Sequence, residues 1–232
     1  MKKLTEYFSK TEIALWSVSG VMIISSFFIF DRENYMTLIA SLIGITSLIF
    51  AAKGNPVSQI LMIIFSLMYG AISFTFSYYG EMITYLGMTL PMSVTALVSW
   101  LKNPYEKGKN EVKVNTSFSK KEILFMIFLT LAVTLVFYFI LKRLKTSNLI
   151  PSTISVATSF AAVYLTFRRS PYFALLYAMN DIVLIILWIL ASIHDTSYIS
   201  VVVCFMAFLA NDIYGFISWR RMEKRQKKTT VN

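Results

Sequence analysis

The run "SYISVVVCFMAFLANDIYGFISW", residues 197–219, is long and apolar enough to indicate the fold of the whole chain. A helix needs about 20 consecutive, mostly apolar residues to cross the hydrocarbon core of a lipid bilayer. This run meets that length, and it carries an amide and a carboxyl side by side, Asn211 and Asp212, among its apolar residues. It therefore predicts a membrane-spanning helix with a polar pair inside it.

The composition extends this interpretation to the rest of the chain. Of its 232 residues, 56% are hydrophobic and 15% are charged, whereas a soluble domain carries roughly 25% charged residues. We predict an all-α polytopic membrane protein that crosses the lipid bilayer with eight helices. The other seven predicted spans cover residues 14–30, 35–52, 57–78, 81–101, 122–141, 148–168 and 172–194.

The basic residues are placed as membrane topology requires. A net charge of +10 could suggest nucleic-acid binding, but these residues lie in short gaps between apolar runs and in the tail "RRMEKRQKK", so we expect no nucleic-acid partner. By the positive-inside rule, the side with more lysine and arginine is cytoplasmic. That side receives both termini, Lys53, the 102–121 loop, Arg168 and Arg169; the other receives Arg32 and the cluster at 142–145. We therefore expect an inner-membrane protein with cytoplasmic N- and C-termini.

Cysteine and histidine are too few for a metal site or a disulfide framework. Cys204 lies within an apolar run and His194 lies next to a predicted loop, and each is the sole residue of its type in the sequence. These counts argue against zinc and thiol chemistry. We expect no cofactor and no metal.

Two short patterns occur twice in the chain. "AAKGNP" ends at Pro56 and "TFRRSP" at Pro171, an offset of 115 residues, while "VSWLK" and "ISWRR" place Trp100 and Trp219 at an offset of 119. We interpret them as marks of two parallel three-helix repeats, an arrangement known in transporters; the alternative is a chance coincidence. The predicted divisions are an N-terminal segment with an extra helix (1–34), a first repeat (35–101), a cytoplasmic loop and linker helix (102–147), a second repeat (148–219) and a basic cytoplasmic tail (220–232).

Asn180 and Asp181 form a second polar pair, inside the run 172–194. Polar and ionisable residues within a span usually face the bundle interior or a water-filled cavity, which makes them candidates for function. The asparagine of each pair lies eight residues from the cytoplasmic end of its helix, roughly 12 Å deep at 1.5 Å per residue. Because the two helices are antiparallel neighbours, we expect both pairs, including Asn211 and Asp212, to converge on one substrate site.

Aromatic residues share helical faces with the two asparagines. Rings can stack on a flat heterocycle while amides bond its edge, and a cationic ring also gains from cation–π attraction and from a nearby carboxylate. The predicted aromatic contributors are Phe173, Tyr177 and Trp188 beside Asn180, and Tyr214 beside Asn211.

The first half of the chain offers different groups at the matching positions. Projected through the repeat, Asp181 corresponds to Ser66 and Asp212 to Ser93. The other expected contributors from this half are Gln59, Tyr69 and Tyr85. Unequal halves suit a ligand with two different ends, such as a base and a ribose.

Each candidate also has a structural interpretation. Asn and Asp side chains can bond across helices within a membrane, at about 0.6 kcal/mol per contact, and the aspartates could instead pair with a cytoplasmic-side arginine. Tyr177 and Tyr214 could be packing residues, Trp100 and Trp219 are expected to anchor at the membrane interface, and Glu81 is expected in a solvated outer turn. Which member of each Asn-Asp pair faces the ligand stays open, since neighbours on a helix point about 100° apart.

"YGEMITYLGMTLPM" (79–92), followed by Trp100, and "NDIYGFISW" (211–219) resemble the two hallmark stretches of the PnuC family of nicotinamide riboside transporters. The similarity covers nearly the whole chain from the second predicted span to the tail. It implies a SWEET-like 3+1+3 helix arrangement, a homotrimer, and facilitated diffusion of a vitamin or nucleoside that a cytoplasmic kinase then traps. It also places Asn180 and Asn211 on the family's asparagines in the corresponding helices.

The chain departs from the family pattern at several positions. Phe173 and Leu176 stand where carriers of nicotinamide riboside often have tryptophans; Tyr85 stands where Asn or Gln is common; Asp181 and Asp212 replace apolar or small residues. We expect uptake of nicotinamide riboside, with a deoxynucleoside, thiamine or riboflavin as alternatives.

Two other functional classes remain open. One is an intramembrane enzyme that uses Asp181 and Asp212 as paired acids, although neither aspartate lies in a Gly-x-Gly-Asp context. The other is a membrane scaffold, which would bind no ligand.

Overall fold

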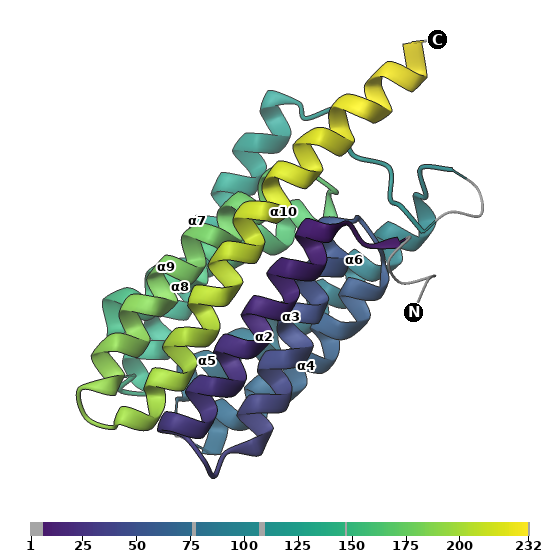
Figure 1. The fold of residues 1–232 in the computed structure, drawn as a ribbon. Helices are drawn as coiled ribbons and strands as arrows, with labels where there is room; N and C mark the ends of the chain where they lie inside the picture. The colour runs from purple at the N-terminus through teal and green to yellow at the C-terminus, as the bar shows by residue number, and fades with distance from the viewer. Residues whose placement is uncertain (1–6, 76–77, 107–109, 147, 232) are drawn as a thin grey trace.

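The computed structural model describes residues 7–75, 78–106, 110–146 and 148–231, and these form a bundle of long helices without a β-strand (Figure 1). Eight segments of it are long and apolar enough to cross a membrane, which confirms the predicted all-α, eight-span fold. In chain order they are α2 (Lys10–Phe30), α3 (Tyr35–Ala52), α4 (Val57–Thr75), the composite of α5 (Tyr79–Ile83), η1 (Thr84–Thr89) and α6 (Leu90–Lys102), α7 (Lys120–Arg143), α8 (Leu149–Phe167), α9 (Tyr172–Ser192), and α10 (Ile199–Val231) with the preceding turn η2 (Thr196–Tyr198).

The first span begins earlier than its apolar run suggests. Ser9 and Glu12 form a capping box, in which the Glu12 N–H donates to Ser9 Oγ (3.2 Å) and the Ser9 N–H donates to the Glu12 carboxylate (2.7 Å). Such a box satisfies helix N–H groups that have no partner within the helix. The helix therefore starts at Lys10, and residues 76 and 77 of the predicted third span lie outside the described residues.

The fourth and last spans also differ from simple continuous helices. η1 is a π-helical turn, a rare geometry that hydrophobic periodicity does not reveal and that often occurs at functional sites. α10 continues through the predicted tail to Val231. Within this extension, Glu223 accepts from Arg220 (2.5 Å) and Lys227 (2.8 Å), pairs whose spacing stabilises an exposed helix.

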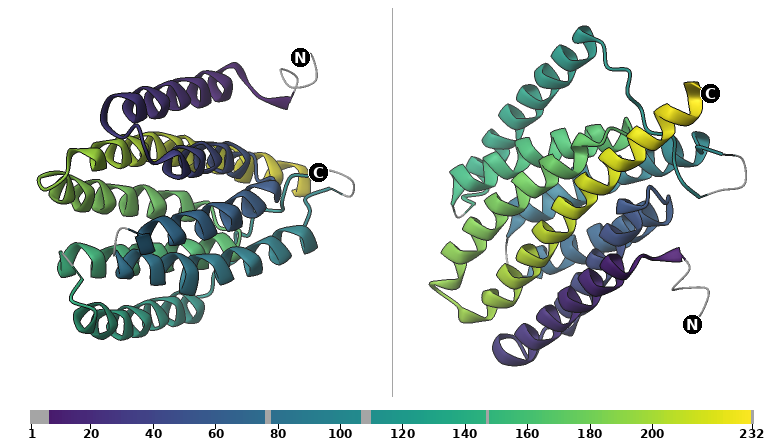
Figure 2. Two further views of the ribbon diagram at one scale, coloured as in Figure 1. Left: turned by 90° about the horizontal axis from the view of Figure 1, so that it is seen from below. Right: turned by 45° about the horizontal axis from the view of Figure 1, so that its top comes forward.

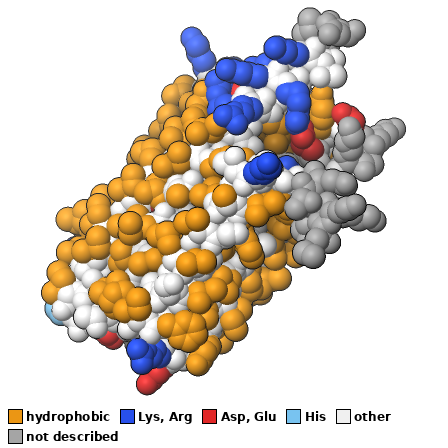
Figure 3. Space-filling model, in the orientation of Figure 1, with side chains coloured by type: hydrophobic (Ala, Val, Ile, Leu, Met, Phe, Trp, Pro, Cys, Tyr) orange, Lys and Arg blue, Asp and Glu red, His pale blue; other side chains and the backbone are white. Residues whose placement is uncertain are grey.

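α2 and α7 lie at opposite sides of the bundle (Figure 2). α2 packs against α3 and α10, whereas α7 packs mainly against α8. Only Leu141 of α7 is buried, so this helix presents most of its apolar side chains outward. Figure 3 shows the resulting apolar body, with Lys and Arg gathered at the end where α10 emerges.

The repeated Ser-Trp pairs join the two halves reciprocally. Ser99 Oγ and Trp100 Nε1, near the end of α6, donate to the Phe167 and Thr166 carbonyls of α8, both at 2.8 Å. In the other half, Ser218 Oγ and Trp219 Nε1 of α10 donate to the Ala52 and Ala51 carbonyls of α3, both at 2.7 Å. The last carbonyls of a helix have no partner within it. Thus α6 caps the end of α8, and α10 caps the end of α3. The two tryptophan donors are 119 residues apart and their acceptors, Ala51 and Thr166, are 115 residues apart, the two offsets seen in the sequence.

The tryptophans themselves are interior residues. Trp100 and Trp219 are fully buried, and their ring centroids lie 5.4 Å apart. The expectation that they anchor the protein at the membrane interface is therefore wrong. Their indole N–H groups donate to the carbonyls of Thr166 and Ala51 at helix ends and not to lipid headgroups.

The two turns that follow α3 and α8 have the same geometry. Gly54 and Arg169, which are 115 residues apart, both have a left-handed backbone, with φ of 62° and 57°. The loop before α7 bonds to both turns: the Val112 N–H donates to the Gly54 carbonyl (2.9 Å) and the Asn115 N–H to the Arg169 carbonyl (3.0 Å). Gln226 of α10 holds this loop in turn, by accepting from the Val114 N–H at 2.8 Å.

Candidate functional site

Asp181 of α9 and Asp212 of α10 meet in the interior of the bundle. Each residue is 4% exposed, and the two carboxyl groups interact electrostatically between the packed helices α9 and α10. The predicted convergence of the two helices at one depth is thus seen at the aspartates. Two carboxylates this close repel each other when both are ionised, and a bound cation would relieve that repulsion.

The two asparagines point to other helices. Asn180 Oδ1 accepts from Thr158 Oγ1 of α8 (2.8 Å), whereas Asn211 Nδ2 donates to Ser19 Oγ of α2 (2.9 Å) and to the Ala207 carbonyl (2.8 Å). The structure therefore does not bring the two amides together. Neighbouring residues on a helix point about 100° apart. In each pair the aspartate can therefore face the other pair's aspartate while the asparagine faces a third helix.

An aromatic cluster occupies the interior on the first-half side of the aspartates. Tyr69 of α4 and Tyr85 of η1 lie with ring centroids 4.5 Å apart, and Trp188 of α9 lies 6.5 Å from Tyr69. Phe65 and Phe205 add their rings to Tyr69 at 5.4 and 6.1 Å. Tyr85 lies in the π turn and is buried there. Three of the predicted contributors, Tyr69, Tyr85 and Trp188, thus share one cluster.

Several buried polar atoms near this cluster have no hydrogen-bond partner among the described residues. Ser66 Oγ and Ser73 Oγ flank Tyr69 on one face of α4, at helical spacing, and Asp181 Oδ2 on α9 is also unpartnered. Leaving such an atom unpaired costs about 1–3 kcal/mol. In native proteins, a ligand or an ordered water usually supplies the missing partner. These atoms therefore mark the interior around Tyr69 and Asp181 as a place where a polar ligand could bind.

Glu81 is an interior acid that the sequence reasoning missed. It is 4% exposed and its Oε2 atom has no partner, so the expectation of a solvated outer turn is wrong. Its position four residues before Tyr85, inside an apolar run, was the available signal. No lysine or arginine pairs with Glu81, Asp181 or Asp212 in the described part of the chain. The interior thus carries three carboxyl groups without a basic partner.

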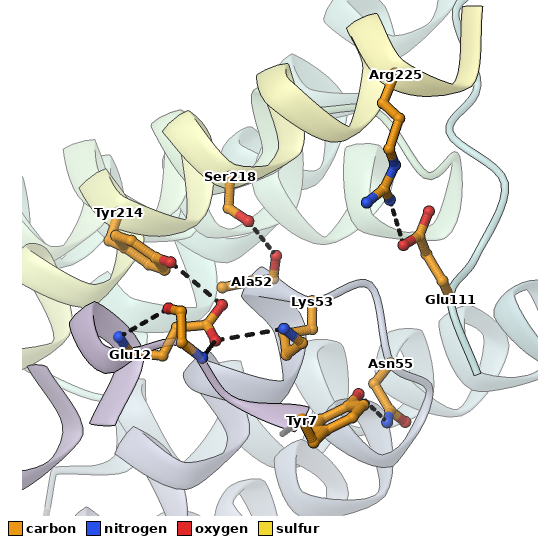
Figure 4. A network of polar contacts seen from close by, with 10 residues as sticks. Tyr7, Glu12, Ala52, Lys53, Asn55, Glu111, Tyr214, Ser218 and Arg225 are labelled. Carbon is orange, nitrogen blue, oxygen red and sulfur yellow. Dashed lines mark hydrogen bonds and ion pairs between the residues drawn. The ribbon is translucent and has the colours of Figure 1, made fainter. Parts of the chain in front are cut away.

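The remaining predicted residues lie toward the end of the bundle where the α10 extension emerges. Phe173 packs against Trp219 (4.9 Å between ring centroids), and Tyr177 lies 6.2 Å from Phe173 with its hydroxyl in reach of Thr166. Tyr214 donates to Glu12 of α2 at 3.2 Å (Figure 4). Gln59 bonds its neighbour Ser58 and lies about two turns before Ser66. These residues lie apart from the Tyr69 cluster, and their substrate contacts stay predictions.

A cavity of about 650 Å³ opens between the loop before α7 and the α10 extension. Lys113, Arg169 and Lys227 line it together with one acidic residue, Glu223, so its lining is mainly basic. It lies outside the interior cluster of carboxyls and rings. Among the described residues, no group of three His, Cys, Asp or Glu side chains could hold a metal ion.

Comparison with known proteins gives the family. The model of the nicotinamide mononucleotide transporter family matches residues 34–221. A protein named nicotinamide riboside transporter PnuC, from Neisseria mucosa, is 23% identical over 215 residues, which are 91% of this chain and 82% of the relative. A protein of the same name from Haemophilus influenzae is 23% identical over 193 residues, covering 83% of this chain and 82% of the relative.

The fold agrees with a solved member. The crystal structure of the vitamin B3 transporter PnuC matches with a TM-score of 0.81 at 22% identity, over 94% of both chains. The family is one of transporters and is not enzymatic, so the hypothesis of an intramembrane aspartyl enzyme is wrong. The chain belongs to the PnuC family, the family of the nicotinamide mononucleotide transporter model, and is a multi-pass membrane transporter.

Proposed function

We propose that this transporter carries nicotinamide riboside into the cell by facilitated diffusion, and that a cytoplasmic kinase traps the product. The observation that supports it is the acidic, aromatic interior. In the described part of the chain, Glu81, Asp181 and Asp212 have no basic partner, and Tyr69 of α4 and Tyr85 of η1 contribute buried rings. Nicotinamide riboside has a pyridinium ring with a fixed positive charge. Such a ring gains both from nearby carboxylates and from aromatic faces.

The same interior disfavours a phosphorylated substrate. The family model is named for the mononucleotide, whereas the two relatives are named for the riboside. A phosphate group placed near three carboxyls without a basic partner would be repelled, and buried like charges without compensation are costly. We therefore favour the riboside over the mononucleotide.

Thiamine is the second candidate, because its thiazolium ring is also a fixed aromatic cation. Phe173 and Leu176 stand at the positions where carriers of nicotinamide riboside often have tryptophans. The Phe173 ring packs against the rings of Trp100 and Trp219. A neutral deoxynucleoside or riboflavin would leave the interior carboxyls without a cation, so we rank both lower.

Uptake into proteoliposomes tests the proposal. Vesicles with the purified protein are expected to equilibrate labelled nicotinamide riboside without an ion gradient, and thiamine and nicotinamide mononucleotide are expected to compete weakly. Accumulation above the outside concentration that depends on a proton or sodium gradient would contradict facilitated diffusion. Equilibration of thiamine without that of nicotinamide riboside would contradict the substrate.

We also propose that both termini lie in the cytoplasm of the inner-membrane protein. Cys204 is buried, so cysteines added at exposed sites can be read against a low background. Thr229 and Thr196 are exposed at opposite ends of α10 and η2. In intact cells an impermeant thiol reagent is expected to label Thr196→Cys and to leave Thr229→Cys unlabelled; the reverse pattern would contradict this orientation.

The oligomeric state is part of the same proposal. The outward apolar face of α7, where only Leu141 is buried, is compatible with a homotrimer as well as with lipid. Native mass spectrometry of the purified protein is expected to give the mass of three chains, and a monomer that transports normally would contradict it.

A further inference from the structure

The N-terminal helix α2 lies outside both repeats but is tied firmly to α10. Its cytoplasmic end carries Glu12, which is 4% exposed and accepts from the Tyr214 hydroxyl (3.2 Å) and from Lys53 Nζ (3.3 Å) (Figure 4). In the preceding segment, Tyr7 accepts from Asn55 Nδ2 at 2.8 Å. These contacts fix the position of α2 along α10 and along the turn after α3.

Further into the membrane, α2 reaches the polar pair of α10. Ser19 is 2% exposed, and its Oγ accepts from Asn211 Nδ2 at 2.9 Å. The second N–H of the same amide donates to the Ala207 carbonyl at 2.8 Å. Because a backbone carbonyl can only accept, the bond to Ala207 also decides which end of the amide is nitrogen.

One atom of the Asn211 amide, its oxygen, has no hydrogen-bond partner among the described residues. Its two N–H groups are used, and its Oδ1 atom is buried with no donor among the described residues, although the residue is only 1% exposed. A buried acceptor without a partner costs about 1–3 kcal/mol. Asn211 can therefore accept a hydrogen bond in the interior, but it cannot donate one.

We propose that Ser19 is a positioning residue of the substrate site, and that it makes Asn211 a pure acceptor for a hydroxyl or N–H group of the substrate. This inference rests on the proposed function, uptake of nicotinamide riboside, and on the expectation from the sequence that Asn211 contacts the substrate. The riboside carries suitable donors in its three ribose hydroxyls and its carboxamide. The extra helix then contributes to recognition from outside the two repeats.

Two substitutions at Ser19 and one matched control test this role. Ser19→Ala removes the acceptor for one N–H of Asn211, and Ser19→Cys keeps the volume while weakening that acceptor. Ser26→Ala is the control, since Ser26 lies on the same helix, is 4% exposed and bonds only the Ile23 carbonyl of its own helix among the contacts described (2.9 Å). We expect Ser19→Ala to weaken binding of nicotinamide riboside about 5- to 10-fold, Ser19→Cys to weaken it less, and Ser26→Ala to leave it unchanged.

Analogues of the riboside separate positioning from a general structural effect. Each analogue lacks one donor: the 2′-, 3′- or 5′-hydroxyl, or the carboxamide N–H groups. For one of them, titration calorimetry is expected to give equal affinities for the wild type and Ser19→Ala. An analogue without that donor makes no bond to Asn211 Oδ1, so its affinity does not depend on how Ser19 holds the amide. Equal weakening for every analogue, or an unchanged affinity of a folded Ser19→Ala protein, overturns the inference. If the wild type itself does not bind nicotinamide riboside, it is the proposed function that fails.

Discussion

Replacing Asp181 by asparagine is expected to weaken the binding of nicotinamide riboside on the order of 100-fold, with little effect on an uncharged nucleoside. The amide keeps the shape of the side chain and removes its negative charge. A carboxylate about 5 Å from a fixed cation contributes about 3 kcal/mol at an effective dielectric constant of about 20. Asp181 is 4% exposed and has no basic partner among the described residues, so little else screens this attraction.

Asp195→Asn is the matched control for this change. Asp195 lies in the exposed turn before η2, and its side chain accepts from the Ser197 N–H at 2.9 Å, a bond that asparagine can also make. It should leave the affinity unchanged. Asp212→Asn is expected to resemble Asp181→Asn, because the two carboxyls lie together. Small and equal losses for charged and uncharged ligands would mean that both aspartates are structural.

Trp219→Phe and Trp100→Phe are each expected to lower the stability of the protein by about 1–3 kcal/mol. Phenylalanine keeps an apolar ring but cannot donate, so the carbonyl of Ala51 or Thr166 loses one of its two N–H donors and keeps only the backbone N–H of Gly54 or Arg169. Since the two bonds join the same kinds of donor and acceptor at matching positions in the two halves of the chain, the losses should be similar. Thermal unfolding of the purified variants in detergent measures both.

Trp16→Phe provides the comparison. Trp16 lies on α2, is 43% exposed, and donates to Thr46 Oγ1 at 3.1 Å on the surface. Water or lipid headgroups can replace that bond, so we expect a change within about 0.5 kcal/mol. If Trp16→Phe destabilises the protein as much as Trp219→Phe does, the reciprocal caps do not hold the halves together.

The helices could be predicted from the sequence because the bilayer makes a simple demand on length and polarity. The π turn in the fourth span and the extension of α10 beyond the membrane could not be predicted from the sequence. The π turn at Thr84–Thr89 is a rare geometry that the hydrophobic periodicity of the run does not reveal. The helical continuation to Val231 depends on Gln226 docking onto Val112 and Val114, more than 100 residues away in the chain.

The candidate site shows a similar limit. Counting residues along α9 and α10 predicts the depth of both Asn-Asp pairs, and the aspartates do meet. Counting does not predict the direction in which a side chain points around the helix axis, because the neighbouring helices set it. Asn180 accepts from Thr158 of α8, and Asn211 donates to Ser19 of α2. Glu81 was missed because a nearby helix end suggested solvent, whereas the fold buries it.

The most direct test of the account is a titration of the wild-type protein with nicotinamide riboside and with its reduced dihydropyridine form. The two ligands share the ribose and the carboxamide, and they differ chiefly in the positive charge of the ring. If Glu81, Asp181 and Asp212 recognise a cation, calorimetry will show the charged riboside binding at least about 10-fold more tightly, a difference of about 1.4 kcal/mol. Equal affinities, or tighter binding of the reduced form, would contradict the account.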